Sequence, residues 1–242
     1  MSDTDSLYAA SQPYIVDFAF DDAVADVFPD MIRRSVPGYE TIVSLLAVIA
    51  ETYFQPGTKI YDLGCSLGAG ILAVHSRLGD QPVKYVAVDG SSSMMDKCKQ
   101  NLSRHIPSSH YQCLHQDIRD TEIGGASVVI MNFTLQFLPQ QDRDAVVKNI
   151  YEGLSPGGAL ILCEKVFRLD QEENDLLVDL HHQFKSANGY SDLEISQKRT
   201  ALENVMNLNS VDEHLGRLKQ MGFSQTAQWF QCFNFIGLLA VK

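Results

Sequence analysis

A glycine-rich turn between a predicted strand and a predicted helix is the feature that most constrains this chain. Residues 59–63 are short and apolar, and they lead directly into Asp62-x-Gly64-x-Ser66-x-Gly68. Residues 69–77 then follow a helical pattern. Glycine lets the backbone approach a ligand closely, and the N-terminus of a helix favours negative charge. The turn therefore predicts a small-molecule site at a strand end, although the G-x-G-x-x-G spacing of dinucleotide folds is absent.

Strands and helices alternate on both sides of this turn. Apolar runs predict strands at 59–63, 84–88, 111–114, 126–131 and 159–163, and amphipathic patterns predict helices at 69–77, 91–104 and 140–154. Such alternation is typical of an α/β fold with an open, doubly wound and mostly parallel sheet. We expect one domain over residues 1–242.

The two ends of the pattern are less regular. Residues 1–20 resemble a loose polar arm, and helical patterns begin at Asp21, with a strongly apolar helix over 41–53. After Glu164 the chain becomes polar, so that about 165–219 is expected to be a helical insertion before the final strands. The last strand is predicted over 233–241.

The charge balance narrows the function. The chain has 30 acidic and 19 basic residues, a formal net charge of −11, and its basic residues form no cluster larger than a pair. Such a surface repels a phosphate backbone, so we expect no direct contact with nucleic acid and favour an enzyme that acts on small molecules.

The cysteines and the apolar runs indicate the compartment. The five cysteines form no C-x-x-C pair, which favours a reducing compartment over a disulfide framework or a zinc site. The N-terminus has no signal-peptide core, and no apolar run approaches the ~20 residues of a membrane span. We therefore expect a cytoplasmic protein with no membrane contact and no metal.

Three polar residues follow predicted strands and become candidate ligands of a nucleoside. Asp89 ends the second strand, where a carboxylate can accept both hydroxyls of a ribose. Asp117 follows the third strand and is a candidate for the adenine amino group, although a plain surface carboxylate is equally consistent with the sequence. Asn132 ends the fourth strand, at the edge where open α/β sheets bind ligands.

The same turn also matches G-x-S-x-G, the nucleophile elbow of hydrolases, which would make Ser66 a nucleophile. The motif follows the first strand, whereas hydrolases place several strands before it. None of the seven histidines has an evident partner, and most are expected to be surface or packing residues. His181 and His182 are adjacent, so they cannot share one helix face as a metal pair.

The turn, Asp89 and the Leu154-x-Pro156-Gly157-Gly158 stop resemble class I S-adenosylmethionine-dependent methyltransferases. Ser66 stands where many of these have glycine. Longer strings are more specific and are similar to those of the carboxy-S-adenosyl-L-methionine synthase family, from about residue 18 to the C-terminus. They are residues 27–31, 34–39, 61–68, 132–137, 188–191 with 193–199, and 229–235.

The resemblance implies a Rossmann-like fold and a reaction other than methylation. Members of this family convert S-adenosyl-L-methionine and prephenate to carboxy-S-adenosyl-L-methionine and phenylpyruvate. The product supplies a partner enzyme that carboxymethylates the wobble uridine of certain tRNAs. The resemblance also implies a homodimer that needs no metal, with S-adenosyl-L-methionine as a substrate.

The resemblance assigns ligand contacts residue by residue. At Gly90 the chain departs from the family, which often has asparagine there. Arg199 is expected to be catalytic because it would hold the new carboxylate. A guanidinium is a natural bidentate partner of a carboxylate, although Arg199 could equally be a surface residue on sequence grounds. The expected contacts are Tyr39, Gly64, Cys65, Ser66, Asp89, Gly90, Asp117, Ile118, Asn132 and Arg199.

Two other functions stay open at this point. A conventional small-molecule methyltransferase would share the nucleoside site, although the chain lacks the D/N-P-P-Y string of enzymes that methylate amino groups. A non-catalytic subunit that binds S-adenosylmethionine would keep the fold without turnover.

Overall fold

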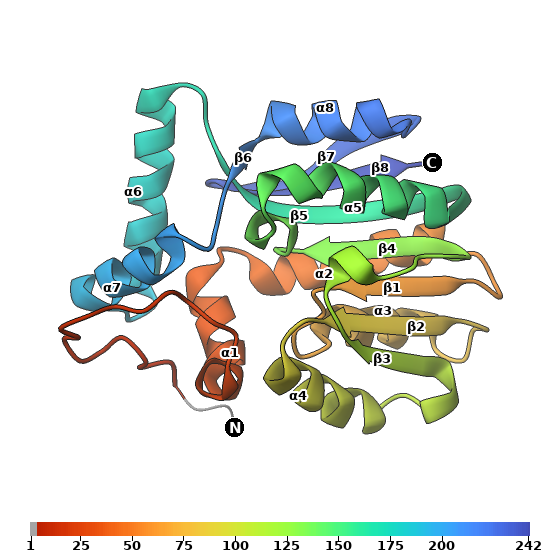
Figure 1. Ribbon diagram of the computed structural model, residues 1–242, viewed down its shortest axis with the longest axis horizontal. Coiled ribbons are helices and arrows are strands. Elements are labelled where there is room, and N and C mark those ends of the chain that lie inside the picture. Colours follow the sequence, from red (N-terminus) through yellow and green to blue (C-terminus); the bar gives the residue numbers. More distant parts are fainter. Residues whose placement is uncertain (1–3) are drawn as a thin grey trace.

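The computed structural model describes residues 4–242, and a twisted sheet lies at its centre (Figure 1). The strand order is β3-β2-β1-β4-β5-β8-β7. Strands β1 to β5 are parallel, β8 is antiparallel to β5 and β7, and the short β6 pairs with the end of β5. The strands are β1 (Lys59–Leu63), β2 (Lys84–Asp89), β3 (Tyr111–His115), β4 (Ala126–Asn132), β5 (Leu154–Phe167), β6 (Asn209–Ser210), β7 (Gln225–Cys232) and β8 (Phe235–Val241).

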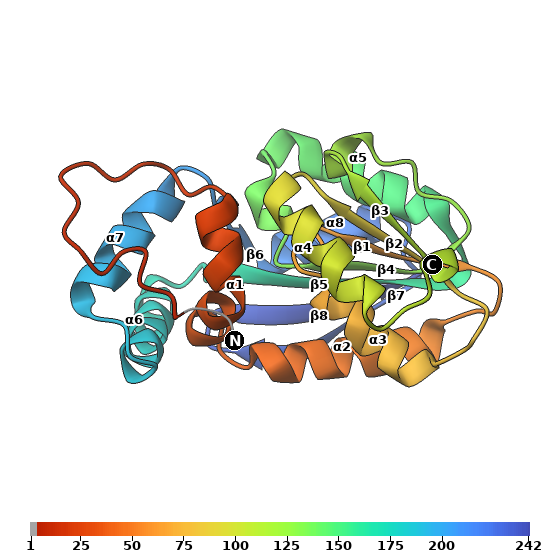
Figure 2. The same cartoon turned by 90° about the horizontal axis from the view of Figure 1, so that it is seen from below.

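Helices cover both faces of the sheet, as the alternating pattern predicts (Figure 2). On one face, α2 (Tyr39–Tyr53), α3 (Ala69–Leu78) and α4 (Ser92–Ser103) pack on Ile60 and its neighbours. On the other, α5 (Gln140–Gly153) and α8 (Val211–Met221) pack on Tyr61 and its neighbours. Consecutive strand residues point to opposite faces, so a buried strand must be apolar throughout. This arrangement confirms the expected doubly wound α/β fold.

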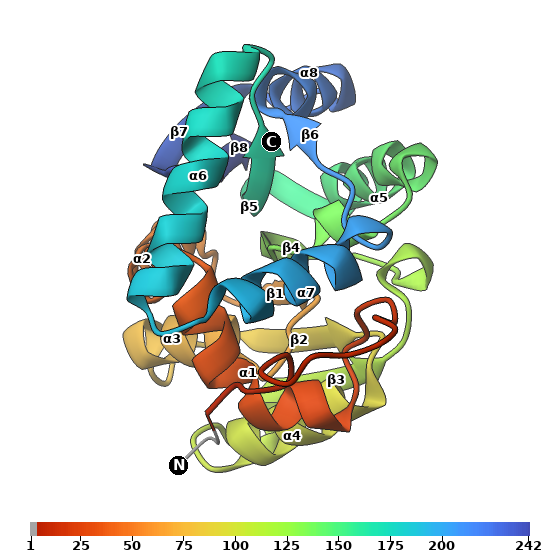
Figure 3. The same cartoon turned by 90° about the vertical axis from the view of Figure 1, so that its left-hand side faces the viewer.

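A third group of helices stands over the carboxyl ends of the strands (Figure 3). It consists of α1 (Asp22–Ser35), α6 (Gln171–Ala187) and α7 (Asp192–Glu203). Side-chain caps set where these helices begin: Asp21 accepts from the backbone N–H of Val24, and Ser191 forms a capping box with Glu194. Short 3-10 turns lie at η1 (Ser108–His110), η2 (Ile118–Asp120) and η3 (Leu135–Phe137).

The helical insertion is shorter than the sequence indicates. Only α6 and α7 leave the sheet, whereas α8, which lies in the expected 165–219 insertion, packs on the sheet through Leu218 and Leu215. The polar composition of α8 hides this role because a single apolar stripe is sufficient to cover a sheet.

The expectation that the N-terminal arm is loose is also wrong for residues 4–20. Residues 4–20 contain no helix or strand, yet Asp5 is only 2% exposed and Phe18 and Phe20 pack against the apolar cluster of α1. The backbone N–H of Phe18 donates to the carbonyl of Ala201 in α7 at 2.8 Å. Residues 1–3 of the expected arm lie outside the described residues.

Strand β5 continues beyond the point where the apolar run ends. We expected a strand over 159–163, but Glu164 and Lys165 still pair with Ile236 and Phe235 of β8. The strand persists because its backbone is fully paired, although charged side chains interrupt the apolar pattern. In the described residues, no helix has the length and apolar character that crossing a bilayer requires.

Candidate active site

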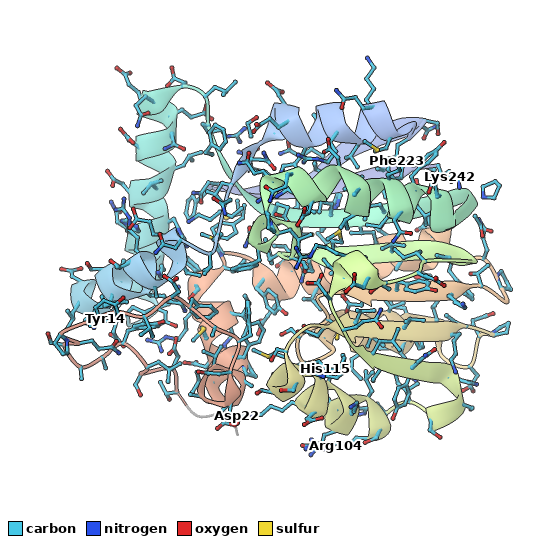
Figure 4. The ribbon with its side chains drawn as sticks, in the orientation of Figure 1. Tyr14, Asp22, Arg104, His115, Phe223 and Lys242 are labelled. Atoms are coloured by element: carbon cyan, nitrogen blue, oxygen red, sulfur yellow. The ribbon has the colours of Figure 1, made fainter. Side chains whose placement is uncertain are left out.

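A cavity of about 1210 Å³ lies between the carboxyl ends of the strands and the layer formed by α1, α6, α7 and the N-terminal arm. In Figure 4, His115 marks the end of β3 beside this cavity, and Tyr14 marks the outer side of the arm. The switch point of an open parallel sheet lies at this edge, where the chain leaves β1 and β4 in opposite directions.

All ten residues that the sequence analysis selects line this one cavity. They come from the ends of four strands with the loops that follow them, and from two helices, so the fold brings together positions up to 160 residues apart in the chain. Which ligand atoms each residue contacts stays a prediction. The residues are Tyr39, Gly64, Cys65, Ser66, Asp89, Gly90, Asp117, Ile118, Asn132 and Arg199.

The turn after β1 is built around glycine and a strained serine. Gly64 has φ +76°, and a Cβ there would lie 2.3 Å from Oγ1 of Thr134, so only glycine fits. Ser66 has φ +51°, a left-handed conformation that explains why glycine is frequent at this position in methyltransferases. The Ser66 backbone N–H donates to Oδ2 of Asp89 at 2.8 Å, which locks the turn to the end of β2.

The floor of this half of the cavity is acidic. Asp62 is fully buried, and burial together with the nearby Asp89 raises its pKa to about 7. Burial also raises the pKa of Asp89, although the backbone N–H groups of Ser91 and Ser66 oppose the rise. The negative charge of Asp89 is thus held in place by two backbone donors, ready to accept from hydroxyl groups.

The ends of β3 and β4 supply the remaining polar contacts of this half. Asp117 is held by Arg119, whose Nη2 donates to Oδ2 at 2.7 Å, and this hydrogen bond lowers the pKa of Asp117. Oδ1 of Asn132 is buried without a hydrogen-bond partner among the described residues. An unpaired buried acceptor is costly, so a ligand donor at this position fits the cavity.

Gly90 differs from the other glycines of the site. Its φ is not in the left-handed region, and the nearest atom to an added Cβ is the Gln116 carbonyl oxygen at 4.0 Å. The asparagine that relatives often have here would therefore fit without moving the backbone.

The other half of the cavity is basic, which sequence reasoning missed. Besides Arg199, the lining includes Lys165 from β5, Lys185 from α6 and Lys198 from α7, and the imidazoles of His181 and His182. The residues lie far apart in the chain, and only the fold gathers them. His181 also packs edge to face against Phe235, so the expectation that most histidines are surface or packing residues is not contradicted by these two.

Burial and mutual repulsion shape these basic groups. Burial, Lys185 and Arg199 lower the pKa of Lys165 to about 8, and burial lowers the pKa of Lys185 to about 8. His181 donates from Nε2 to the backbone carbonyl of Ser35 at 2.8 Å, and burial lowers its pKa to about 3. The carbonyl requires a proton on Nε2, so His181 is a neutral imidazole that donates this bond.

Lys198 forms an ion pair within residues 4–242, which Lys165 and Lys185 do not, although burial lowers its pKa to about 8 as well. Its Nζ lies 3.5 Å from Oδ2 of Asp5 and donates to Oγ of Ser35 at 3.0 Å. Arg199, the adjacent residue, is exposed on the rim of the cavity and makes no ion pair with any described residue. The site therefore joins an acidic half at the strand ends to a basic half under α6 and α7.

The alternative chemistries find little support. Oγ of Ser66 faces Sδ of Met94 at 3.8 Å, and no histidine of the described chain contacts it, so the elbow of a hydrolase is not assembled. Within residues 4–242, no group of three or more histidine, cysteine or acidic residues could hold a metal ion.

Comparison with known proteins supports the same fold. The family model described as a methyltransferase domain matches residues 60–158. The fold is similar to an O-methyltransferase family protein from Burkholderia thailandensis (TM-score 0.67, 18% identity, 92% of this chain and 60% of that one). It is also similar to human N-acetylserotonin methyltransferase in complex with SAM (TM-score 0.59, 15% identity, 91% of this chain and 55% of that one).

Sequence relatives are much closer and span the whole chain. The carboxy-S-adenosyl-L-methionine synthase of Vibrio cholerae is 51% identical over 242 residues, which is 100% of this chain and 98% of the relative. The synthase of Actinobacillus pleuropneumoniae is 50% identical over 238 residues, 98% of this chain and 99% of the relative. The chain belongs to the carboxy-S-adenosyl-L-methionine synthase family, and it is a transferase with a class I methyltransferase fold.

Proposed function

We propose that this enzyme converts S-adenosyl-L-methionine and prephenate to carboxy-S-adenosyl-L-methionine, phenylpyruvate and water. The observation that carries the proposal is a single cavity with an acidic half at the strand ends and a basic half under the helical layer. The acidic half suits a nucleoside with a sulfonium, and the basic half suits a dianionic second substrate. Membership of the family supports the same pair of substrates.

The reaction balances without a protein base. Prephenate loses CO2 and hydroxide as its ring becomes aromatic, which leaves phenylpyruvate. The hydroxide removes a proton from the sulfonium methyl group and becomes water. The carbanion of the resulting ylide forms a new C–C bond to the trapped CO2, and the product is a carboxymethyl sulfonium.

The protein's part in this chemistry is to position the reacting groups and to exclude water. The CO2 must stay beside the methyl carbon, and bulk water would protonate the ylide. Phe133 and Phe235, whose rings meet edge to face at 5.8 Å between centroids, form part of the apolar wall that keeps the cavity dry. Arg199 is proposed to hold the carboxylate that migrates from prephenate to the sulfonium product, and is the catalytic residue of this scheme.

The nucleoside contacts follow from the lining of the acidic half. Asp89 accepts from the ribose hydroxyls, and Asp117 and Ile118 border the adenine. Backbone N–H groups of the Gly64–Ser66 turn and the side chains of Tyr39 and Asn132 complete the contacts to S-adenosyl-L-methionine. The proposed site contains no metal.

The test is mass spectrometry of the nucleosides after purified protein is incubated with S-adenosyl-L-methionine, with and without prephenate. We expect a prephenate-dependent species that is heavier than S-adenosyl-L-methionine by one CO2. The appearance of S-adenosylhomocysteine would identify a conventional methyltransferase instead. Binding of S-adenosyl-L-methionine without any conversion would identify a non-catalytic subunit.

The cellular setting is proposed on the same grounds. The enzyme is expected to act in the cytoplasm as a homodimer and to supply a separate enzyme that carboxymethylates the wobble uridine of tRNA. The net charge of −11 supports a division of labour in which this protein handles the small molecules and its partner binds the RNA.

A further inference from the structure

Three cations in the basic half of the cavity form no ion pair within the described residues. Lys165, Lys185 and Arg199 line the cavity, and none of them forms an ion pair or side-chain hydrogen bond with residues 4–242. Lys198 differs because Asp5 and Ser35 hold its ammonium group. Of these four cations, the protein therefore pairs one with a carboxylate and leaves three without an ion pair in the part of the chain that the structure describes.

The two unpaired lysines come from different elements and are held by aromatic rings. Nζ of Lys165 on β5 lies 5.8 Å from the ring centre of Phe235, and Nζ of Lys185 on α6 lies 5.9 Å from that of Tyr190. Lys185 is only 6% exposed. Two ammonium groups that repel one another inside a partly dry cavity are unfavourable unless an anion joins them.

The proposed substrates bring carboxylates with different fates. The ring carboxylate of prephenate leaves as CO2 and ends on the sulfonium product, whereas the pyruvyl carboxylate stays with phenylpyruvate. One guanidinium cannot hold both, because the two groups part during the reaction. A site that keeps each product fragment in place needs two anion subsites.

We propose that Lys165 and Lys185 form a second carboxylate subsite, separate from Arg199, that holds the 2-keto carboxylate retained in the arylpyruvate product. This inference rests on the proposed function and deepens it. Phe235 lies under Lys165, so an aromatic ring attached to the keto acid would meet an apolar surface beside the lysine pair. The lysine pair thereby selects a keto acid over a neutral aromatic compound.

The competing occupant is the amino-acid end of S-adenosyl-L-methionine. That end carries an ammonium group next to its carboxylate, and two lysines would repel the ammonium. A 2-keto acid has no positive charge, so the lysine pair favours it.

The experiment measures two dissociation constants for each variant by calorimetric titration. One is for S-adenosyl-L-methionine, and the other is for phenylpyruvate added to protein saturated with S-adenosyl-L-methionine. The variants are Lys165→Met, Lys185→Met, and Lys219→Met as the matched control, because Lys219 is exposed on α8, away from the cavity. Lys165→Arg tests rescue of the charge.

Each of the two cavity variants should raise the Kd for phenylpyruvate by about tenfold or more, which is the effect of losing one charge-assisted hydrogen bond. The Kd for S-adenosyl-L-methionine should change by less than about threefold, which also shows that the variant is folded. Lys165→Arg should recover most of the loss, and Lys219→Met should match the wild type.

Three results would overturn the inference. If the variants weaken the binding of S-adenosyl-L-methionine and leave the Kd for phenylpyruvate unchanged, the lysines hold the amino-acid end of S-adenosyl-L-methionine. If neither ligand is affected while the wild type still converts prephenate, the lysine pair is not a subsite although the proposed function stands. A wild type that neither binds phenylpyruvate nor converts prephenate would remove the proposed function, and this subsite with it.

Discussion

Arg199 is the residue whose role can be separated most cleanly from cofactor binding. It is exposed and lines the cavity from α7, whereas Asp89 and the glycine-rich turn line it from the strand ends. We expect Arg199→Ala to lower kcat by about 100-fold or more, because a carboxylate that loses a bidentate guanidinium is no longer fixed beside the methyl carbon. The Kd for S-adenosyl-L-methionine should stay within about threefold of the wild type.

The comparison of kcat with the Kd decides the assignment. Steady-state kinetics and titration of S-adenosyl-L-methionine on the same preparation provide both numbers. Equal losses in turnover and in nucleoside binding would show that Arg199 belongs to the nucleoside site and is not catalytic. Arg199→Lys is the matched variant, and it should retain only part of the activity because an ammonium cannot form the bidentate pair.

The lowered pKa values of Lys165 and Lys185 predict how the binding of the second substrate depends on pH. Both are about 8, so each ammonium is charged below pH ~8 and loses its charge above it. A bound carboxylate favours the charged form, so the anion binds tightly below that pH and weakly above it. Burial also lowers the pKa of Lys198 to about 8, although Asp5 pairs with it, so Lys198 loses its charge over the same range. The remaining basic groups of this half are His182, whose pKa burial lowers, and Arg199.

We therefore expect KM for prephenate to rise between pH ~7 and ~9, while the Kd for S-adenosyl-L-methionine changes little. Initial rates over that range check the prediction, and Lys165→Arg should move the rise to higher pH since a guanidinium keeps its charge. A KM that stays flat for the wild type across the range would contradict it.

At the scale of elements, the N-terminal arm holds α7 in place. Gln197 donates through Nε2 to the carbonyls of Tyr8 and Ala10, at 2.8 and 3.0 Å, and accepts from the backbone N–H of Gln12. Asp5 accepts from the hydroxyl of Tyr190 and pairs with Lys198. Since α7 carries Arg199, the arm fixes the helix that presents the proposed catalytic residue.

This arrangement makes Asp5 a positioning residue, and we expect Asp5→Asn to lower the free energy of unfolding by roughly 3 kcal/mol. The reason is that the buried ammonium of Lys198 loses its counter-charge. Chemical denaturation measures the change, with Asp80→Asn, an exposed loop residue, as the control. The double variant Asp5→Asn with Lys198→Met should recover part of the loss, because no unpaired charge remains. A double variant less stable than Asp5→Asn would contradict this account of Asp5.

The elements also show what a sequence can and cannot predict. Regular strands such as Lys84–Asp89 and the Ser91 cap of α4 follow from apolar runs and capping chemistry, which are local. Asp5 and Lys165 could not be found this way. A buried aspartate in an arm without regular structure, and a cavity lysine after an apolar run, depend on contacts with residues far away in the chain.

The candidate site likewise has a half that the sequence predicts and a half that only the folded structure reveals. The acidic half comes from a turn and strand ends in a fixed order, so motif and resemblance find Gly64, Asp89 and Asn132 together. The basic half comes from β5, α6 and α7, where lysine and histidine side chains look like ordinary surface residues until the chain folds over the sheet. His181 illustrates the point, since burial lowers its pKa to about 3 only in the folded protein.

At the scale of the whole molecule, the charge predicts that this enzyme does not bind tRNA. The formal net charge is −11, and the cations that do gather line an internal cavity. Fluorescence anisotropy with labelled tRNA should show no saturable binding below about 100 µM at ~0.15 M salt. Saturable binding at that salt would contradict the proposed division of labour between this enzyme and a tRNA-modifying partner.

The central claim is that one cavity passes a carboxylate from prephenate to the sulfonium methyl group. The measurement that tests it most directly uses prephenate with 13C in its ring carboxylate, S-adenosyl-L-methionine, and an excess of unlabelled bicarbonate. Mass spectrometry should find a sulfonium product that is heavier by one CO2 and carries the label in full, because the CO2 never leaves the cavity. A product that has exchanged its label with bicarbonate, or S-adenosylhomocysteine in its place, would contradict the claim.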